Sequence, residues 1–381
     1  MTAAFDAAVI GAGPAGSAAA TALASAGFRT LLLEKEAFPR RKVCGAYLAG
    51  DALPSLERLG AAPAVLAARP ERIGRARLHL RGAPPVIFDL PSPGLGLSRA
   101  LLDELLAARA AQAGADVRFG ARVSALAGSP GDFRLSTGCG DIRARVVIGA
   151  WGRWDALDRR LGRTFLAGPA RYVAWSAEYG EGPAELAGEV RLYAFPGGYC
   201  GLSRVERGRV NLAGVVALRA RPAGGWEAVL ARARRENAAL NADLASLGRP
   251  EAGFLGAGPV FFTRKPAAEG GILMVGDAAG VVDPFSGEGQ AIALASGLLA
   301  GETASRWLAG ALPHGDPAGA WGALWKESFA SRFAWSAMFR RILLSGRLGA
   351  LGASLGGRPL ARLAIRHLQG AGTRVPSLPP A

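Results

Sequence analysis

The chain has 381 residues, of which 50% are hydrophobic and 20% charged, and its formal net charge is +15 at pH 7. This hydrophobic content is sufficient for a large buried core, in one large domain or two intertwined ones, and it excludes an intrinsically disordered chain. The positive charge favours anionic partners. However, the basic residues are scattered and no recognised nucleic-acid-binding module is visible, so no nucleic-acid partner is predicted.

The chain contains three cysteines, Cys44, Cys139 and Cys200. They are too few and too far apart for a disulfide framework, an iron–sulfur ligand set or a zinc ribbon, so no metal site is predicted. The first apolar run begins almost at Met1, without a signal peptide, and no apolar run reaches the ~18 residues that a membrane span needs. We expect a cytoplasmic protein, with peripheral contact at a membrane surface as the alternative.

The first motif is a glycine-rich turn between an apolar run at residues 5–10 and a run of small residues at 17–25. A strand, a tight turn and a helix start in this order bring backbone N–H groups against a pyrophosphate. The first glycine permits the turn, the second permits close approach of the phosphate, and the third lets the helix lie against the strand. The candidate cofactor-binding residues of this turn are Gly11, Gly13, Pro14, Ala15 and Gly16.

A second apolar run, at residues 29–33, ends in Glu34, which lies 23 positions after Gly11. A carboxylate in this place can accept hydrogen bonds from both ribose hydroxyls of an adenosine, and it repels a 2′-phosphate. The turn and the carboxylate together therefore favour FAD or NAD over NADP. The adjacent Lys35 is included among the candidate cofactor-binding residues.

A basic loop follows at residues 38–45, with the sequence Phe-Pro-Arg-Arg-Lys-Val-Cys-Gly. Its cations either face a dinucleotide phosphate, for which Arg41 is the candidate, or lie in solvent. Cys44 also has two interpretations. It is a small hydrophobic residue of the interior, or a thiol beside basic residues and Gly45 that lies close to the chemistry.

The rest of the chain alternates between two patterns. A helix capped by Ser98 and a strand at 142–148 continue the strand–helix pattern, to which the run 272–277 returns. Between them, strands separated by turns predict an antiparallel sheet crossed by a helix at 226–247. The predicted strands of that sheet are 172–178, 189–195, 199–205 and 210–216. Two further strands, at 75–80 and 86–90, interrupt the strand–helix pattern earlier in the chain.

These patterns predict three parts of the chain. Residues 1–72, 98–170 and 258–325 form a discontinuous nucleotide-binding domain, residues 73–97 and 171–257 form an inserted substrate domain, and residues 326–381 form a helical C-terminal segment. An insertion of this kind places a ligand crevice between the two domains.

A second glycine-rich stretch begins at Gly276 and Asp277, again after an apolar run. Asp277 at the end of that strand can accept a hydrogen bond from a ribityl hydroxyl. Gly287 and Gly289 open a helix at 290–308, whose positive end stabilises negative charge on a reduced flavin ring.

With these motifs in this order, the sequence resembles the FAD-dependent para-hydroxybenzoate hydroxylase-like superfamily, and its geranylgeranyl reductase branch more than the others. The resemblance spans residues 1 to about 310. It implies an α/β fold, in which a Rossmann-like FAD-binding domain carries an inserted antiparallel-sheet substrate domain and a helical C-terminus. The matching residues are 11–16 with Glu34, 38–40 with 42–45, Ser98 and Arg99 with Asp103, 276–279, and Pro284 with 286–289.

The resemblance also implies how FAD is bound. The adenosine lies at Glu34, the pyrophosphate over Gly13 and Arg99, and the ribityl chain at Asp277. The isoalloxazine ring lies near Pro284, Gly287, Glu288 and Gly289, with Cys44 close to it. Residues 193–196 look like a degenerate form of the branch's aromatic-Phe-Pro motif, which places Phe195 at the border of the substrate cavity.

One departure from the superfamily concerns Trp151. Where an Asp-Gly pair usually follows the strand that ends at residues 149–150, this chain has Trp151 and Gly152. An indole has no acceptor to replace the carboxylate, which argues against direct use of NADH or NADPH. Trp151 either borders the flavin and the substrate cavity or simply closes the end of the strand. A tryptophan-halogenase signature and a C-terminal cysteine cluster are both missing, which weighs against halogenation and quinone-linked electron transfer.

Beyond residue 325, aromatic residues such as Phe329 and Phe333 alternate with arginines such as Arg332. This pattern fits an interfacial amphipathic helix that brings the enzyme to a lipid, or a helix packed on the flavin domain. The packed helix is the favoured interpretation.

We predict an FAD-dependent oxidoreductase that passes a hydride from reduced FAD to a carbon–carbon double bond of a lipophilic, prenyl-like substrate. Cys44, Tyr193 and Tyr199 are the candidate donors of the accompanying proton. The first alternative is an FAD-dependent monooxygenase that hydroxylates an aromatic or polyketide-like substrate. The second is a non-catalytic flavoprotein that carries electrons. The electron donor is left open.

Overall fold

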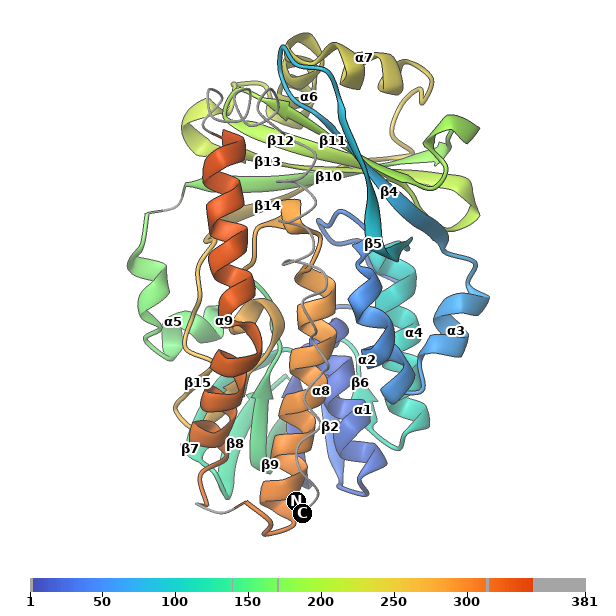
Figure 1. The fold of residues 1–381 in the computed structure, drawn as a ribbon. Coiled ribbons are helices and arrows are strands. Elements are labelled where there is room, and N and C mark those ends of the chain that lie inside the picture. Colours follow the sequence, from blue (N-terminus) through green and yellow to red (C-terminus); the bar gives the residue numbers. More distant parts are fainter. Residues whose placement is uncertain (1–2, 139, 170, 313–314, 345–381) are drawn as a thin grey trace.

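The computed structural model describes residues 3–138, 140–169, 171–312 and 315–344 (Figure 1). Within these residues the chain forms two eight-stranded sheets, one in the lower and one in the upper half of Figure 1. The predicted α/β class, with a parallel sheet, an antiparallel sheet and a helical C-terminal region, is confirmed.

The first sheet is built around parallel strands in the order β16–β9–β1–β2–β6. The middle of this sheet, at residues 7–10, 30–33 and 146–148, is a buried run of mostly small and branched apolar residues, which is typical of a sheet covered on both faces. Their carboxyl ends meet at one edge, because Ile10 pairs with both Leu33 and Gly149, and Gly149 pairs with Met274. The strands of this sheet are β1 (Ala3–Ile10), β2 (Thr30–Leu33), β6 (Asp116–Arg118), β7 (Val123–Ser129), β8 (Asp132–Thr137), β9 (Gly140–Gly149), β15 (Ala268–Glu269) and β16 (Ile272–Met274).

Two helices beside this sheet, α1 (Pro14–Ser25) and α8 (Gly289–Leu308), pack closely on each other. Their backbones approach at two glycines of α8. A Cβ atom added at Gly297 would lie 2.0 Å from the Ala15 carbonyl oxygen, and one added at Gly301 would lie 2.8 Å from the Ala19 carbonyl oxygen. The neighbouring helices are α2 (Leu53–Arg58), α3 (Ala62–Ala67), α4 (Arg99–Gln112) and α5 (Ala156–Arg160), and Ser98 caps α4 as predicted.

The second sheet has the strand order β14–β10–β13–β12–β11–β4–β5–β3. All its pairs are antiparallel except β4 with β11, which run parallel. Helices α6 (Gly225–Glu236) and α7 (Ala238–Ala245) cover its upper face in Figure 1. Its strands are β3 (Tyr47–Leu48), β4 (Glu71–His79), β5 (Val86–Gly96), β10 (Tyr172–Glu181), β11 (Glu189–Phe195), β12 (Gly198–Arg204), β13 (Arg209–Ala217) and β14 (Ala252–Val260).

The single helix predicted at 226–247 is divided at Asn237. This residue has an extended conformation, and its side chain accepts a hydrogen bond from the Leu240 backbone N–H and donates to the carbonyls of His79 and Ala194. Asparagine favours the first position of a helix over its interior, which explains the break. The second sheet also recruits β3 from within residues 1–72, so the two sheets do not follow the predicted domain limits everywhere, and that division stays a prediction.

The C-terminal helix α9 (Pro317–Leu344) packs on the core of the first sheet. Phe329, Phe333 and Arg332 are all buried, so this part of the stretch agrees with the packed helix and not with an interfacial one. The rest of the stretch, residues 345–381, lies outside the described residues. Among the described helices, none combines the length and apolar character needed to cross a bilayer.

The close approach of α1 and α8 gives a direct test of the fold. We expect Gly297→Ala to lower the free energy of unfolding by about 1–3 kcal/mol, because the new Cβ atom collides with backbone of α1 that cannot move alone. Gly322→Ala is the matched control on α9, where an added Cβ atom meets no atom within 4 Å. It should be neutral or stabilise by up to about 1 kcal/mol. Equal melting temperatures for the two variants would contradict this packing.

Candidate active site

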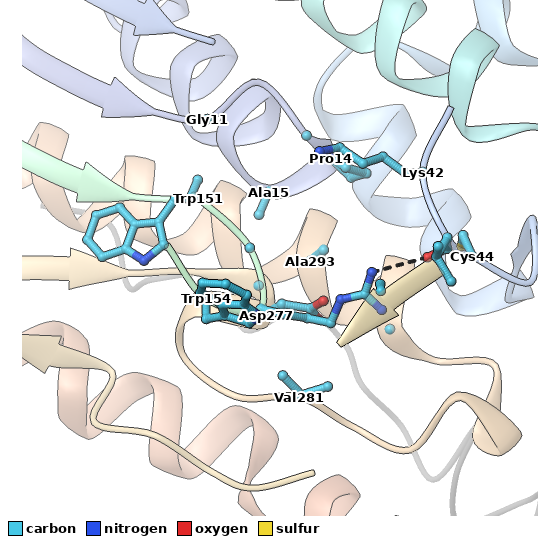
Figure 2. Close-up of a pocket in the computed structure, with 18 of the residues that line it drawn as sticks. Gly11, Pro14, Ala15, Lys42, Cys44, Trp151, Trp154, Asp277, Val281 and Ala293 are labelled. Atoms are coloured by element: carbon cyan, nitrogen blue, oxygen red, sulfur yellow. Dashed lines mark hydrogen bonds between the residues drawn. The ribbon is translucent and has the colours of Figure 1, made fainter. Parts of the chain in front are cut away.

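Most of the predicted residues line one cavity of about 530 Å³, which lies at the carboxyl edge of the first sheet. Figure 2 shows residues from both glycine-rich stretches, from the basic loop and from the end of β9 around it. The predicted residues that line it are Gly11, Gly13, Pro14, Ala15, Glu34, Lys35, Cys44, Gly45, Arg99, Trp151, Gly276, Asp277, Pro284, Gly287 and Gly289.

Two predicted residues of the first domain lie elsewhere. Gly16 packs inside the turn, where an added Cβ atom would lie 1.7 Å from the Gly11 carbonyl oxygen. Arg41 donates hydrogen bonds to the carbonyls of Ala252 and Gly253 at 3.3 and 3.2 Å and pairs with Glu178 at 3.4 Å. The side chain of Arg41 therefore ties the basic loop to the second sheet and does not face the cavity.

The glycine-rich turn presents backbone to the cavity. Gly11 has φ +107°, and a Cβ atom there would lie 2.5 Å from the Ala150 carbonyl oxygen of the neighbouring strand end. Helix α1 begins at Pro14, and Gly13 before it supplies no side-chain cap. The N–H groups of the first turn are therefore available to an anion in the cavity, as the motif predicts.

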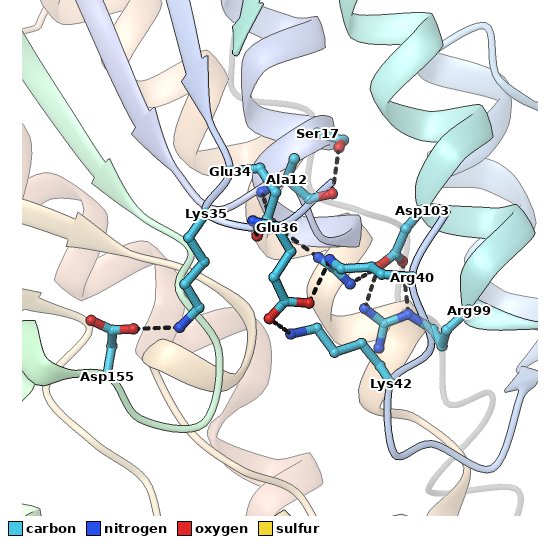
Figure 3. Close-up of polar contacts among 10 residues, drawn as sticks. All are labelled: Ala12, Ser17, Glu34, Lys35, Glu36, Arg40, Lys42, Arg99, Asp103 and Asp155. Atoms are coloured by element: carbon cyan, nitrogen blue, oxygen red, sulfur yellow. Dashed lines mark hydrogen bonds and ion pairs between the residues drawn. The ribbon is translucent and has the colours of Figure 1, made fainter. Parts of the chain in front are cut away.

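Glu34 is buried and already hydrogen-bonded (Figure 3). Its Oε2 accepts from the Ala12 N–H and from Arg40 Nη2, both at 3.0 Å, and its Oε1 accepts from the Glu36 N–H at 3.1 Å. Burial raises the pKa of Glu34, but the charge of Arg40 and these hydrogen bonds outweigh it and hold the pKa below its ordinary value. A carboxylate has about four lone-pair positions. Since Glu34 already accepts three hydrogen bonds, one position remains. This position can accept a hydrogen bond from one ribose hydroxyl, whereas the sequence predicted two.

Two arginines share the buried carboxylate of Asp103 (Figure 3). Arg40 Nη1 donates to Oδ2 at 2.7 Å, while Arg99 donates through Nε and Nη2 at 2.7 and 2.8 Å. Arg99 points toward the phosphate turn, since an added Cβ atom at Gly13 would lie 3.6 Å from its Nη2. Arg40 thus connects the Glu34 and Asp103 carboxylates, a role that its place in a basic loop did not indicate.

Trp151 lines the cavity on the side away from Cys44 (Figure 2). Its Nε1 donates to Asp158 Oδ1 at 3.1 Å, and its ring lies 2.5 Å from where a Cβ atom would be at Gly149. Asp158 is fully buried and also pairs with Arg163 at 2.9 Å. The indole therefore both closes the end of β9 and forms part of the cavity wall.

Lys265 is a buried residue that the sequence motifs did not identify. Its Nζ donates to the backbone carbonyl of Asp277 at 2.7 Å and to that of Arg153. Burial lowers the pKa of Lys265 to about 8. Lys265 joins the loop after β9 to the Asp277 turn, and no local pattern around it signals this contact.

A second cavity, of about 130 Å³, adjoins the first beneath the second sheet. The two share lining residues from the 43–47 loop and the 284–287 loop, including Cys44 and Pro284. Cys44 Sγ lies 3.4 Å from Gln290 Nε2 at this junction. Most of the remaining wall is apolar, and it includes Ala76, Phe88, Leu90, Val190, Leu192, Val215 and Phe285.

Tyr199 lines the second cavity, whereas Tyr193 and Phe195 line neither. Tyr193 and Phe195 belong to the apolar cluster under α6 and α7, where the Tyr193 hydroxyl donates to Asp243 and its ring stacks on His79 at 5.1 Å. Tyr193 and Tyr199 lie on opposite sides of the sheet because successive side chains of a strand point to opposite faces. Tyr193 pairs in register with Cys200, so both face the helices, and Tyr199 faces the other way.

Glu288 lies behind the loop and does not line the cavities. Its side chain is fully buried, and neither carboxylate oxygen has a hydrogen-bond partner among the described residues. Arg332 Nη1 of α9 lies 4.0 Å from Oε2 and pairs with Asp51 at 2.8 Å. Burial raises the pKa of Glu288 from 4.5 to about 8.

This burial predicts a pH-dependent stability. A carboxyl whose pKa is higher in the folded than in the unfolded chain binds its proton more tightly when folded, so wild-type stability falls as the pH rises from about 4.5 through about 8. Glu288→Gln removes this titration. Its melting temperature relative to wild type should therefore increase over the same interval.

Glu327→Gln is the matched control. Glu327 is an exposed residue of α9, the helix that packs beside Glu288. This variant should follow the wild-type pH profile of the melting temperature. Parallel profiles for Glu288→Gln and wild type would contradict the burial of Glu288 without a hydrogen-bond partner.

Comparisons with known proteins agree with this site. A family model described as an FAD binding domain matches residues 4–184. Digeranylgeranylglycerophospholipid reductase 2 of Methanopyrus kandleri is 30% identical over 94% of this chain and 92% of its own length. A menaquinone reductase of Mycolicibacterium smegmatis is 30% identical over 86% of this chain and 82% of its own length.

Solved structures share the fold. A flavin-dependent brominase superposes with a TM-score of 0.81 at 18% identity and covers 97% of this chain, with 94% of the brominase covered. A geranylgeranyl bacteriochlorophyll reductase-like protein from Thermoplasma acidophilum has a TM-score of 0.72 at 22% identity, with 99% and 94% covered. These identities establish the fold alone, whereas the sequence relatives establish the family. The chain belongs to the FAD-dependent oxidoreductase family that includes the digeranylgeranylglycerophospholipid reductases.

Proposed function

We propose that this protein reduces carbon–carbon double bonds in a lipophilic, prenyl-like substrate, with reduced FAD as the hydride donor. The observation that carries the proposal is the apolar second cavity, which meets the first cavity at Cys44 and Pro284. A largely hydrocarbon substrate gains free energy from burial in such a cavity without losing hydrogen bonds to water. Relatives whose names specify prenylated lipids and menaquinone support this substrate class.

In this proposal the residues at the carboxyl edge of the first sheet would hold FAD. Glu34 holds one adenosine ribose hydroxyl, the start of α1 and Arg99 hold the pyrophosphate, and the Asp277 side chain holds the ribityl chain. The ring then lies beside the 284–289 loop, at the junction of the two cavities. FAD bound there would supply hydride transfer, and the positive start of α8 would stabilise negative charge beside it.

The polar residues around the second cavity would provide the proton. Cys44 lies at the junction and Tyr199 on the sheet wall, so both remain candidate donors. Tyr193 is not proposed, because it faces the helices on the other side of the sheet.

The test is an anaerobic turnover of the FAD-loaded protein. The flavin is reduced with dithionite, excess reductant is removed, and digeranylgeranylglycerophospholipid or menaquinone is added in detergent micelles. We expect reoxidation of the flavin and a lipid product that has gained two hydrogens per reduced double bond. An oxygenated product formed only in air would instead identify a monooxygenase, and failure to reduce either probe would contradict the proposal.

The adenosine contact predicts a loss of FAD affinity in Glu34→Gln. A hydrogen bond to a charged group contributes about 1.5–3 kcal/mol, so the dissociation constant should rise roughly 10- to 100-fold in a flavin fluorescence titration. Glu36→Gln is the control, because Glu36 belongs to the same network of charges but does not line the cavity. Similar affinities for Glu34→Gln and wild type would rule out this placement of the adenosine.

A further inference from the structure

We infer that Tyr199 and Asp283 form a proton-delivery pair, in which Tyr199 protonates the substrate in the apolar cavity and Asp283 resupplies Tyr199. The inference rests on the proposed function and names the acid that it requires. It follows from the way in which one hydroxyl connects the cavity wall to a carboxyl group buried behind the 284–287 loop.

Tyr199 lies on β12, on the sheet face that borders the second cavity. Its side chain is buried, and its hydroxyl donates to Asp283 Oδ1 and accepts from the Phe285 N–H at 3.0 Å. The hydroxyl is therefore held at the base of the loop that separates the two cavities. A polar group fixed there is suited to act on a substrate atom at their junction.

Asp283 has no contact with either cavity and is almost fully buried. Its Oδ2 has no hydrogen-bond partner among the described residues, and its nearest cation is Arg340 Nε of α9, at 3.9 Å. Its backbone N–H donates to Ser336 Oγ of α9 at 3.0 Å, which fixes the residue. Burial raises the pKa of Asp283, which favours the protonated form that a proton source needs.

Tyr199 alone is a poor acid. Burial and the adjacent Asp283 carboxyl raise its pKa well above the ordinary value of a tyrosine. A phenol in this environment gives up its proton only if another proton replaces it at once. The carboxyl of Asp283 is the one group that the described structure places in hydrogen-bond contact with the hydroxyl and that can supply one.

Reduction of the double bond requires a hydride and a proton. The double bond gains one hydrogen and two electrons as hydride from the reduced FAD of the proposed function, and one proton from the Tyr199 hydroxyl. The Tyr199 hydroxyl donates to Asp283 in the resting arrangement, so protonation of Asp283 reverses this hydrogen bond and turns the phenolic hydrogen toward the substrate. As that O–H bond breaks, the Tyr199 oxygen takes the proton of Asp283. Tyr199 stays neutral, Asp283 becomes a carboxylate facing Arg340, and a proton from water later restores it.

The chain contains a matched control for this pair. Tyr193 lies on the adjacent strand β11 and its hydroxyl donates to Asp243, so the two pairs have the same chemical groups. They lie on opposite faces of one sheet, and only Tyr199 borders a cavity. Removing each hydroxyl in turn therefore separates loss of a proton donor from loss of a buried Tyr–Asp hydrogen bond.

The experiment compares wild type, Tyr199→Phe, Asp283→Asn and Tyr193→Phe as FAD-loaded proteins. Flavin reoxidation by digeranylgeranylglycerophospholipid in micelles is followed anaerobically by stopped flow, in water and in deuterium oxide. We expect Tyr199→Phe and Asp283→Asn to be on the order of 100-fold slower, the scale of general acid catalysis. The solvent isotope effect of wild type should change in both, while FAD content and the rate of dithionite reduction stay unchanged. Tyr193→Phe should react within about twofold of wild type with the same isotope effect.

Two results would overturn the inference. The first is a Tyr199→Phe variant that matches wild type in rate and isotope effect. If Tyr199→Phe does not retain FAD, the same result for Asp283→Asn would overturn the inference. The second is an equal loss of rate in Tyr193→Phe, which would indicate a general effect on the sheet. If wild type itself does not reduce the lipid, the proposed function fails and the inference fails with it. If wild type reduces the lipid and the variants match it, only the inference fails.

Discussion

The parallel register of the first sheet is the constraint on which the site depends. Because Ile10 pairs with Leu33 and with Gly149, the residues that follow these three strands arrive together at one edge. Gly11, after β1, lies so close to the end of β9 that a Cβ atom has no room beside the Ala150 carbonyl. A side chain at position 11 would separate β1 from the end of β9, and the start of α1 would no longer lie beside the Glu34 carboxylate. The cavity is thus a consequence of strand pairing as much as of its lining residues.

The parts of the site that could be predicted from the sequence are those set by local backbone demands. The glycine turn, the carboxylate after the second strand and the Ser98 cap each require a certain residue type at a fixed distance along the chain. The position of Tyr193 could not be predicted in this way. Adjacent residues of a strand face opposite sides, so a motif placed one residue out of register assigns a side chain to the wrong face. The pairing of Tyr193 with Cys200 settles that choice, and it forms only in the folded sheet.

Some contacts of the site involve residues that lie outside every sequence motif. Lys265 bridges the carbonyls of Arg153 and Asp277, and Trp151 donates to a carboxylate on α5 that is neutralised by Arg163. Neither Lys265 nor Arg163 belongs to a periodic or glycine-rich pattern. Their roles arise because buried polar groups must find partners wherever the fold brings them. The tryptophan at position 151 is therefore explained by its contact with Asp158, which the fold brings to the end of β9.

Helix α9 influences the junction of the cavities although none of its described residues lines them. Arg332, Ser336 and Arg340 lie on one face of this helix, four residues apart, and each faces a group of the 283–288 loop. The two carboxylates of that loop, Asp283 and Glu288, are consequently turned toward α9. The loop then presents backbone, proline and apolar groups to the cavities, together with one serine. An anionic side chain facing the cavities would neutralise the positive partial charge at the start of α8. Because both carboxyl groups are turned toward α9, neither faces the junction beside the positive end of α8.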